Sequence, residues 1–124
     1  MRSEDRTKTD AVRKVERPWG SYKVLHTGEG YQVKLIEVRP GEALSLQYHR
    51  KRSEYWVVVR GNARVTIDDS VRDCQAGETV FVPMGAKHRI ENLSASLFAI
   101  IEVQLGSYLG EDDIVRLEDR YGRM

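Results

Sequence analysis

The chain has 124 residues, which is enough for one domain with one hydrophobic core but not for two. Its 20 basic and 19 acidic residues leave a net charge of +1, so the composition provides no basic surface for nucleic acid or for an anionic membrane. Hydrophobic residues make up 40% of the sequence, and no apolar run approaches the ~18 residues of a membrane-spanning helix. We therefore expect a globular protein without nucleic-acid or membrane partners.

The N-terminal segment, residues 1–16, is mostly polar and charged, and Val12 and Val15 are its only sizeable apolar side chains after the first methionine. Such a segment buries too little apolar surface to offset the entropy that it loses on ordering. We predict a flexible arm over residues 1–16 and a packed domain over residues 17–124. The arm lacks the apolar stretch of a secretory signal, and the single Cys74 cannot form an internal disulfide, so we expect a cytoplasmic protein.

Short runs rich in Val, Ile, Tyr and Trp fill the rest of the chain, and each is too short for a helix. Gly41, Gly61, Gly77 and Gly85 stand at the breaks between runs, where turns often need a positive φ. Residues 110–120 are the segment expected to form a turn or two of helix. Many short strands in about a hundred residues predict an all-β sandwich or barrel. The predicted strands are 21–26, 31–38, 44–48, 54–59, 63–67, 79–82, 89–92 and 97–105.

Four polar residues near two of the glycine-marked turns have the chemistry of metal ligands. Residues two apart in a strand project to the same face, so Gln47 and His49 point together. Glu54 opens the next strand after a short turn and can return a carboxylate to the same place. His88 lies on a strand from the second half of the chain. An amide oxygen, two imidazoles and a carboxylate suit a divalent ion such as Zn, Mn, Fe, Co or Ni.

Each of these residues also has a simpler interpretation. A single histidine on a strand is more often a structural residue than a ligand. Glu54 is close in sequence to Arg50, Lys51 and Arg52, and can form a surface ion pair worth under ~1 kcal/mol. Four such residues at these spacings, set between glycines in both halves of the chain, favour the metal site. We therefore predict that the four polar residues bind one ion.

The two glycine-marked segments match the two signature motifs of the cupin superfamily, with Gln47 where the first motif commonly has its first histidine. Residues 16–124 further resemble the C-terminal isomerase domain of type II mannose-6-phosphate isomerases, which many bacteria carry behind a GDP-mannose pyrophosphorylase. The resemblance covers nearly all of the predicted domain. It rests on the segments ERPWGSYKVL, LSLQYHRKRSEYWVVVRGNARVT, FVPMGAKHRIEN and IEVQLGSYLGEDDIVRLEDRYGR.

The resemblance implies an all-β cupin fold, a double-stranded β-helix or jelly-roll barrel, and interconversion of mannose 6-phosphate with fructose 6-phosphate. It also implies a divalent metal on the four positions named above, with zinc as the first expectation, and a functional role for Arg52. The family's usual run of three histidines is here one histidine followed by Arg50 and Lys51. Because of this change, a second function stays open: the chain can be a non-catalytic cupin that binds a sugar or sugar phosphate. An iron dioxygenase is a third interpretation, supported by the metal motif alone.

An aldose–ketose isomerisation needs a base beside C1 and C2 of the sugar, because a proton moves between them. Glu102 is the first candidate, since it alternates with Ile100 and Gln104 on one face of the last long strand. A structural carboxylate that orients a metal ligand or pairs with an arginine is the equal alternative for this residue. Lys51 is the second candidate, provided that burial favours its neutral amine. We therefore predict catalytic roles for Arg52, Glu102 and Lys51.

Recognition of a phosphate needs cations at the mouth of the barrel, and Arg52 is expected there. Arg52 lies in the first motif, Lys87 adjoins His88 in the second, and Arg116 lies in the C-terminal segment. We predict that these three cations bind the sugar phosphate, and that residues 106–123 lie against the barrel near its open end. Because cupins of this size often pair through their sheets, we also expect a homodimer.

Overall fold

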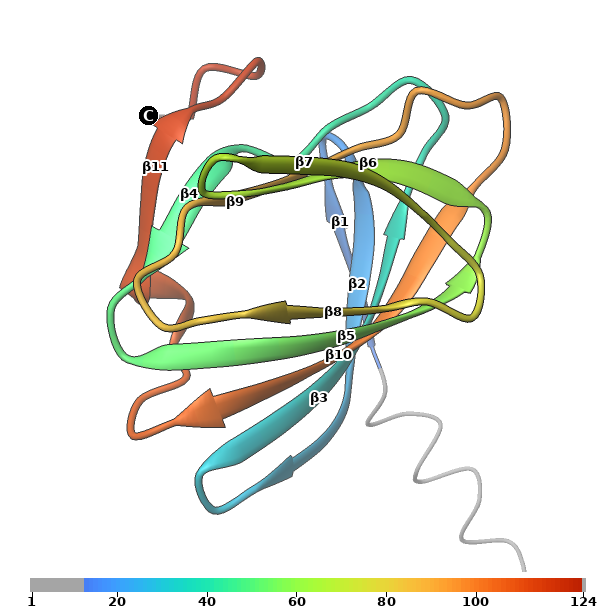
Figure 1. The fold of residues 1–124 in the computed structure, drawn as a ribbon. Helices are drawn as coiled ribbons and strands as arrows, with labels where there is room; N and C mark the ends of the chain where they lie inside the picture. Colours follow the sequence, from blue (N-terminus) through green and yellow to red (C-terminus); the bar gives the residue numbers. More distant parts are fainter. Residues whose placement is uncertain (1–12, 124) are drawn as a thin grey trace, which may run out of the picture.

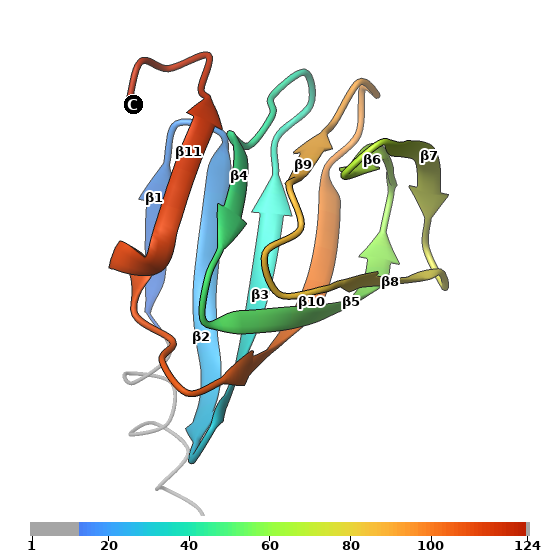
Figure 2. The ribbon, with the colours of Figure 1, turned by 60° about the vertical axis from the view of Figure 1, so that its left-hand side comes forward.

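The computed structural model describes residues 13–123, which form two antiparallel β-sheets that face each other across one interior (Figures 1 and 2). The six-stranded sheet has the order β1-β2-β3-β10-β5-β8, and the five-stranded sheet has the order β11-β4-β9-β6-β7. No helix in the described range is long and apolar enough to cross a membrane. The elements are β1 (Lys14–Arg17), β2 (Gly20–Gly28), β3 (Tyr31–Val38), β4 (Leu46–His49), β5 (Arg52–Arg60), β6 (Asn62–Ile67), β7 (Ser70–Gln75), β8 (Thr79–Val82), β9 (His88–Glu91), β10 (Phe98–Gly106), the 3₁₀ helix η1 (Glu111–Asp113) and β11 (Ile114–Glu118).

The central strand β10 shows why the sequence forms these sheets. Its buried side chains include Phe98, Ile100, Glu102 and Gln104, whereas Leu105 on the opposite face is exposed. This two-residue period is that of a strand with one face on an interior. Because β10 pairs with both β3 and β5, it aligns the inward side chains of three strands in rows across the sheet.

The rows of inward side chains change in character along the barrel. Ile36 and Val58 flank Ile100 in one row, and all three belong to the hydrophobic core. Two rows further along the same strands, Glu54 is paired with Gln104, and both are fully buried. One end of the interior is therefore an apolar core, and the other end is lined by polar side chains.

The folded domain begins earlier than the sequence predicted. Strand β1 starts at Lys14 and pairs with β2 up to Arg17, so the predicted boundary at residue 17 falls inside a strand. The strand lies at the edge of its sheet and alternates between exposed and half-buried positions, which gives it a weak apolar pattern. The rest of the predicted arm, residues 1–12, lies outside the described residues.

Strands β7 and β11 were also missed from the sequence. β7 is exposed at every position except Cys74, so its pairing with β6 leaves no apolar alternation. The turn or two of helix expected over residues 110–120 is confirmed only as the single 3₁₀ turn η1, because the residues after it form β11. β11 pairs with β4, which confirms that the C-terminal segment lies against the barrel.

Gly106 brings the end of β10 close to the start of β5. A Cβ atom at this position would lie 2.1 Å from the backbone oxygen of Lys51, so a larger residue would force the two strands apart. Gly106 is paired in register with Arg52. The close approach therefore fixes the backbone from which the Arg52 side chain extends.

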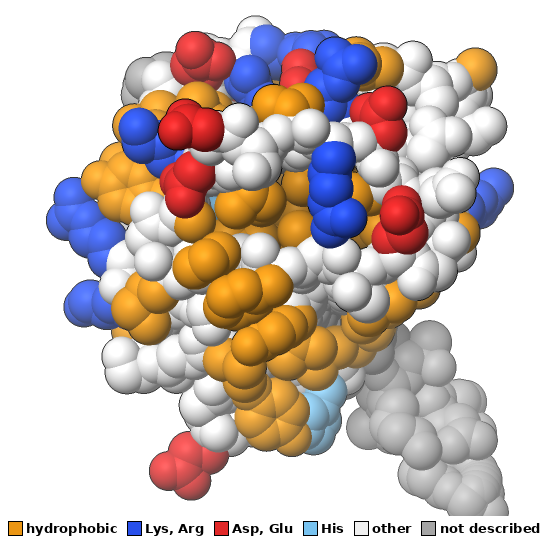
Figure 3. Space-filling view, viewed as in Figure 1, with side chains coloured by type: hydrophobic (Ala, Val, Ile, Leu, Met, Phe, Trp, Pro, Cys, Tyr) orange, Lys and Arg blue, Asp and Glu red, His pale blue; other side chains and the backbone are white. Residues whose placement is uncertain are grey.

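The outer face of the six-stranded sheet exposes several large apolar side chains. Tyr55, Val57, Phe81 and Leu105 are exposed there, and the rings of Tyr55 and Phe81 lie 4.7 Å apart. Apolar side chains gather in a band across the lower half of the view in Figure 3, where Figure 1 shows strands of this sheet. The homodimer expected from the sequence stays a prediction.

Candidate metal centre

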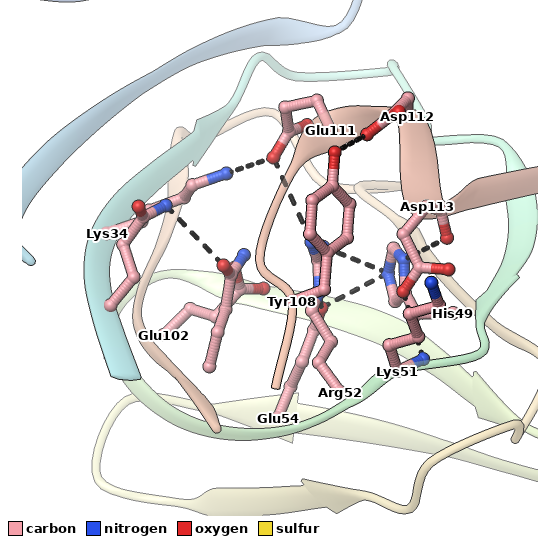
Figure 4. A network of polar contacts seen from close by, with 12 residues as sticks. Lys34, His49, Lys51, Arg52, Glu54, Glu102, Tyr108, Glu111, Asp112 and Asp113 are labelled. Atoms are coloured by element: carbon pink, nitrogen blue, oxygen red, sulfur yellow. Dashed lines mark hydrogen bonds and ion pairs between the residues drawn. The ribbon is translucent and has the colours of Figure 1, made fainter. Parts of the chain in front are cut away.

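A cavity lies at the polar end of the barrel, and residues from both sheets and from the C-terminal segment line it (Figure 4). His49 from β4, Glu54 from β5 and His88 from β9 all belong to this lining. One ligand atom of each residue lies within 4.8 Å of the ligand atoms of the other two, and all three side chains are buried. The structure thus brings three of the four predicted metal ligands into one group.

Hydrogen bonds to backbone carbonyls orient both histidines. The Nδ1 atom of His49 lies 3.3 Å from the carbonyl oxygen of Asp113, and that of His88 lies 3.0 Å from the carbonyl oxygen of Ala86. We assign the proton to Nδ1 in both rings, because a carbonyl can only accept. Nε2 then carries the lone pair that binds a metal. Burial lowers the pKa of His88, which favours the neutral ring that metal binding requires.

Gln47 faces the same interior as His49. It is buried in the cavity lining, and it is paired in register with His88 across β4 and β9. The common inward face predicted from the two-residue spacing is therefore confirmed. Metal binding by the Gln47 amide oxygen stays a prediction.

Glu54 is held by three neighbours. Its Oε2 atom lies 3.1 Å from His49 Nε2 and accepts a hydrogen bond from Arg52 Nε at 2.9 Å. Its Oε1 atom accepts a hydrogen bond from Trp56 Nε1 at 3.0 Å. Burial alone would raise the pKa of Glu54, but nearby positive charge, including that of Arg52, holds that pKa well below its usual range. Glu54 is therefore an ionised carboxylate in the centre of the site.

Arg52 lies inside the site and not at its mouth, where the sequence placed it. Its side chain is 4% exposed, because it lies two residues before Glu54 and so shares the inward face of β5. Its Nη2 atom donates to His49 Nε2 at 3.1 Å, while Nε donates to Glu54. Arg52 thus contacts two of the three candidate ligand atoms. Its buried Nη1 atom has no hydrogen-bond partner among the described residues.

Glu102 reaches the same cavity from β10 and is buried. Burial raises the pKa of Glu102 well above its usual range, and the charge of Glu54 and a hydrogen bond with it act in the same direction. Glu102 also accepts a hydrogen bond from Gln104 Nε2 at 2.7 Å. The two acids therefore differ: the pKa of Glu54 is lowered, and the pKa of Glu102 is raised.

The remaining predicted cations divide into those that reach the cavity and those that do not. Arg116 lines the cavity, and its buried Nε atom has no hydrogen-bond partner within residues 13–123. Lys87 is exposed and outside the lining, because it directly precedes the inward-facing His88. Lys51 is exposed as well, with Nζ 5.3 Å from the ring centre of Tyr108. Lys51 and Lys87 were predicted to act in the site, but neither side chain lines the cavity.

Lys34 and Asp113 also belong to the site, and neither was predicted from the sequence. Lys34 is 3% exposed on the inward face of β3, a position that the two-residue period of that strand could have revealed. The Asp113 carboxylate accepts hydrogen bonds from the backbone N–H groups of Arg50 at 3.2 Å and Lys51 at 3.0 Å. Its role in holding His49 depends on the pairing of β11 with β4, for which the sequence pattern carries no signal.

Two imidazoles and a carboxylate in a buried pocket fit a divalent metal ion. A two-sheet antiparallel barrel with such a group inside it is a cupin. The S161A mutant of Bacillus subtilis oxalate decarboxylase aligns with a TM-score of 0.73 at 22% identity, over 85% of this chain and 30% of that chain. A double-stranded β-helix protein from Klebsiella pneumoniae aligns with a TM-score of 0.73 at 18% identity, over 90% and 95% of the two chains.

The family of the mannose-6-phosphate isomerase C-terminal domain matches residues 4–119, so the chain belongs to that family of cupins. Mannose-1-phosphate guanylyltransferase ManC of Salmonella typhimurium is 54% identical over 112 residues, which are 90% of this chain and 23% of the relative. The xanthan biosynthesis protein XanB of Xanthomonas campestris is 48% identical over 123 residues, which are 99% of this chain and 26% of the relative. The chain thus spans about a quarter of the length of these relatives.

Proposed function

We propose that the chain is a metal-dependent isomerase that interconverts mannose 6-phosphate and fructose 6-phosphate. The observation that carries the proposal is the buried group of His49, Glu54 and His88, which shares one cavity with Glu102, a carboxyl group whose pKa is raised by burial. An aldose–ketose isomerase needs an electrophile at the sugar oxygens and a group that carries a proton, and this cavity has residues for both. Membership in the family supports the choice of substrate.

His49, Glu54 and His88 would hold the ion, with Gln47 as a fourth donor. Zinc is our first choice, and the same donors suit Mn, Co, Ni and Fe. When bound, the ion supplies a Lewis acid that stabilises negative charge on the sugar oxygens. Glu102, as a carboxylate, would take the proton from C2 and return it to C1, and the reverse reaction would use the same two transfers; its raised pKa makes it the stronger base of the two acids in the cavity.

A non-catalytic cupin that binds a sugar or sugar phosphate is the second candidate. It is favoured by the contacts of Arg52, which hydrogen-bonds to His49 and Glu54 and so competes with an ion for both donor atoms. The altered histidine run does not favour either candidate. Arg50 and Lys51 are exposed and outside the cavity lining, so this change leaves the ligand group intact.

A coupled assay separates the two candidates. The chain is loaded with Zn, Mn, Co, Ni or Fe in turn, its metal content is measured, and fructose 6-phosphate formed from mannose 6-phosphate is followed. We expect turnover that depends on the bound metal. Binding of the sugar phosphate without turnover would favour the second candidate, and neither binding nor turnover with any ion would contradict both.

A further inference from the structure

Lys34 is a buried cation to which the roles above assign no function. It lines the cavity from β3, where it is paired in register with Glu102. Its Nζ atom lies 2.6 Å from Glu111 Oε2 and 4.5 Å from the ring centre of Tyr22. Burial of an ammonium group costs free energy unless an anion compensates it. The ion pair with Glu111 supplies that compensation.

Glu111 approaches the cavity from outside the barrel. It belongs to η1, and its side chain is 44% exposed, in contrast to 4% for Lys34 and for Arg52. The same Oε2 atom that pairs with Lys34 lies 4.0 Å from Nη1 of Arg52, the buried donor that lacks a partner in the described chain. One exposed carboxylate thus stands between two buried cations and forms a hydrogen bond with one of them (Figure 4).

A phosphate group suits this position better than the carboxylate does. It has three terminal oxygens and more negative charge, so it can accept hydrogen bonds from Lys34 and from Nη1 of Arg52 at the same time. The two cations are fixed by burial, whereas the side chain of Glu111 is 44% exposed and can turn into water once a phosphate has taken over the compensation of Lys34. Binding of a phosphate would therefore exchange the resident anion for one that satisfies both cations.

We propose that Lys34 and Arg52 form a phosphate pocket in the cavity, and that Glu111 is its internal counter-ion, which the phosphate of the substrate displaces. The inference rests on the proposed function and adds a rule of substrate selection to it. A neutral sugar has no group that can replace the Glu111 carboxylate between the two cations. Glu111 therefore selects phosphorylated sugars over free sugars.

Inorganic phosphate tests this pocket independently of the isomerase reaction. Its affinity is measured by isothermal titration on the full chain, both after chelation and after zinc loading. Glu111→Gln removes the competing charge, so it should tighten phosphate binding roughly ten-fold, the factor associated with one charge-assisted hydrogen bond. Asp112→Asn removes the same charge from the next residue, which is also exposed, and should change the affinity less than about two-fold, because exposed charges are screened. Lys34→Met should weaken binding roughly ten-fold or more.

A Glu111→Gln chain that binds phosphate no more tightly than the parent chain overturns the proposal. The proposal is also overturned if Asp112→Asn tightens phosphate binding as much as Glu111→Gln does. It is overturned as well if neither the parent chain nor Glu111→Gln binds phosphate. The exposed position of Glu111 makes this variant decisive even if Lys34→Met does not fold. Absence of isomerase activity would contradict the proposed function and leave the phosphate result intact, because the two are measured separately.

Discussion

The two ends of the barrel interior are built from the same strands, yet they differ in the side chains that those strands direct inward. On β5, Arg52 and Glu54 begin an inward row that continues with Trp56 and Val58. The alternation of buried and exposed positions is the same along the whole row. The strand period therefore determines which residues are inside, and residue type determines whether the interior packs as a core or binds a ligand.

Burial has opposite energetic consequences at the two ends. Apolar side chains stabilise the fold by roughly 25 cal/mol for each Å² removed from water. Buried ionised groups cost free energy that their partners return only in part. Ser45, Arg52 and Arg116 each have a buried polar atom without a hydrogen-bond partner in the described part of the chain, and all three line the cavity. We infer that the polar end is maintained for a ligand and not for stability.

Phe98→Ala should have the largest effect on stability, because Phe98 is fully buried at the apolar end. Truncation of a core phenylalanine costs about 3–5 kcal/mol in free energy of unfolding, measured by urea denaturation. Leu105→Ala is the matched control on the same strand, since Leu105 is 40% exposed, and it should cost under ~1 kcal/mol. Equal losses in the two variants would remove the distinction between core and surface on β10.

His88→Ala should act on metal binding more than on folding. Loss of one of three protein ligands should weaken zinc binding by about a hundred-fold or more, measured by competition with a chelator, and isomerase activity should fall with it. The free energy of unfolding of the metal-free chain should fall less than in Phe98→Ala. His26→Ala is the control, because His26 is exposed on β2, and this variant should bind zinc as the parent chain does. Unchanged zinc affinity in His88→Ala would exclude the ligand assignment.

Arg52→Lys should separate activity from metal content. Lysine keeps the positive charge but lacks the guanidinium fork that contacts Glu54 and His49, so turnover of mannose 6-phosphate should fall about ten-fold. Metal content and the circular dichroism spectrum should not change. Arg50→Lys, two residues away at an exposed position, should leave turnover unaffected. Full activity in Arg52→Lys would mean that only its charge matters.

Asp113→Ala should have the smallest effect of the four. It removes the carboxylate that accepts two backbone hydrogen bonds in the turn after β4. The loss of these bonds should lower the free energy of unfolding by about 1 kcal/mol. Zinc affinity should fall by a few-fold, because the turn also positions His49. Asp112→Ala in the same 3₁₀ helix is the control for stability and for zinc binding. A larger effect from Asp112→Ala would contradict the role of Asp113.

The sequence was sufficient for the residues whose placement depends on strand period alone. Gln47 and His49 share a face because they are two apart, and the same rule could have placed Arg52 inside, beside Glu54. Arg52 was instead predicted at the mouth of the barrel, because a phosphate needs cations there. The alternation of side chains along β3 could likewise have predicted that Lys34 faces inward.

Contacts between distant segments could not be predicted in this way. Lys34 and Glu111 are 77 residues apart, and they meet because η1 and β11 fold across the end of the barrel. β11 is held by its pairing with β4, and its half-buried residues show no clear alternation. The local pattern therefore gave no reason to expect a strand there, nor a carboxylate between two buried cations.

The most direct measurement of the proposed isomerase follows mannose 6-phosphate by NMR in D₂O with the zinc-loaded chain, whose metal content has been determined. A proton that Glu102 takes from the sugar can exchange with solvent before it is returned, so we predict that fructose 6-phosphate appears and that deuterium enters at the carbon that receives the proton. His88→Ala should give neither signal. A zinc-containing parent chain that forms no product and incorporates no deuterium would contradict an isomerase at the polar end of this barrel.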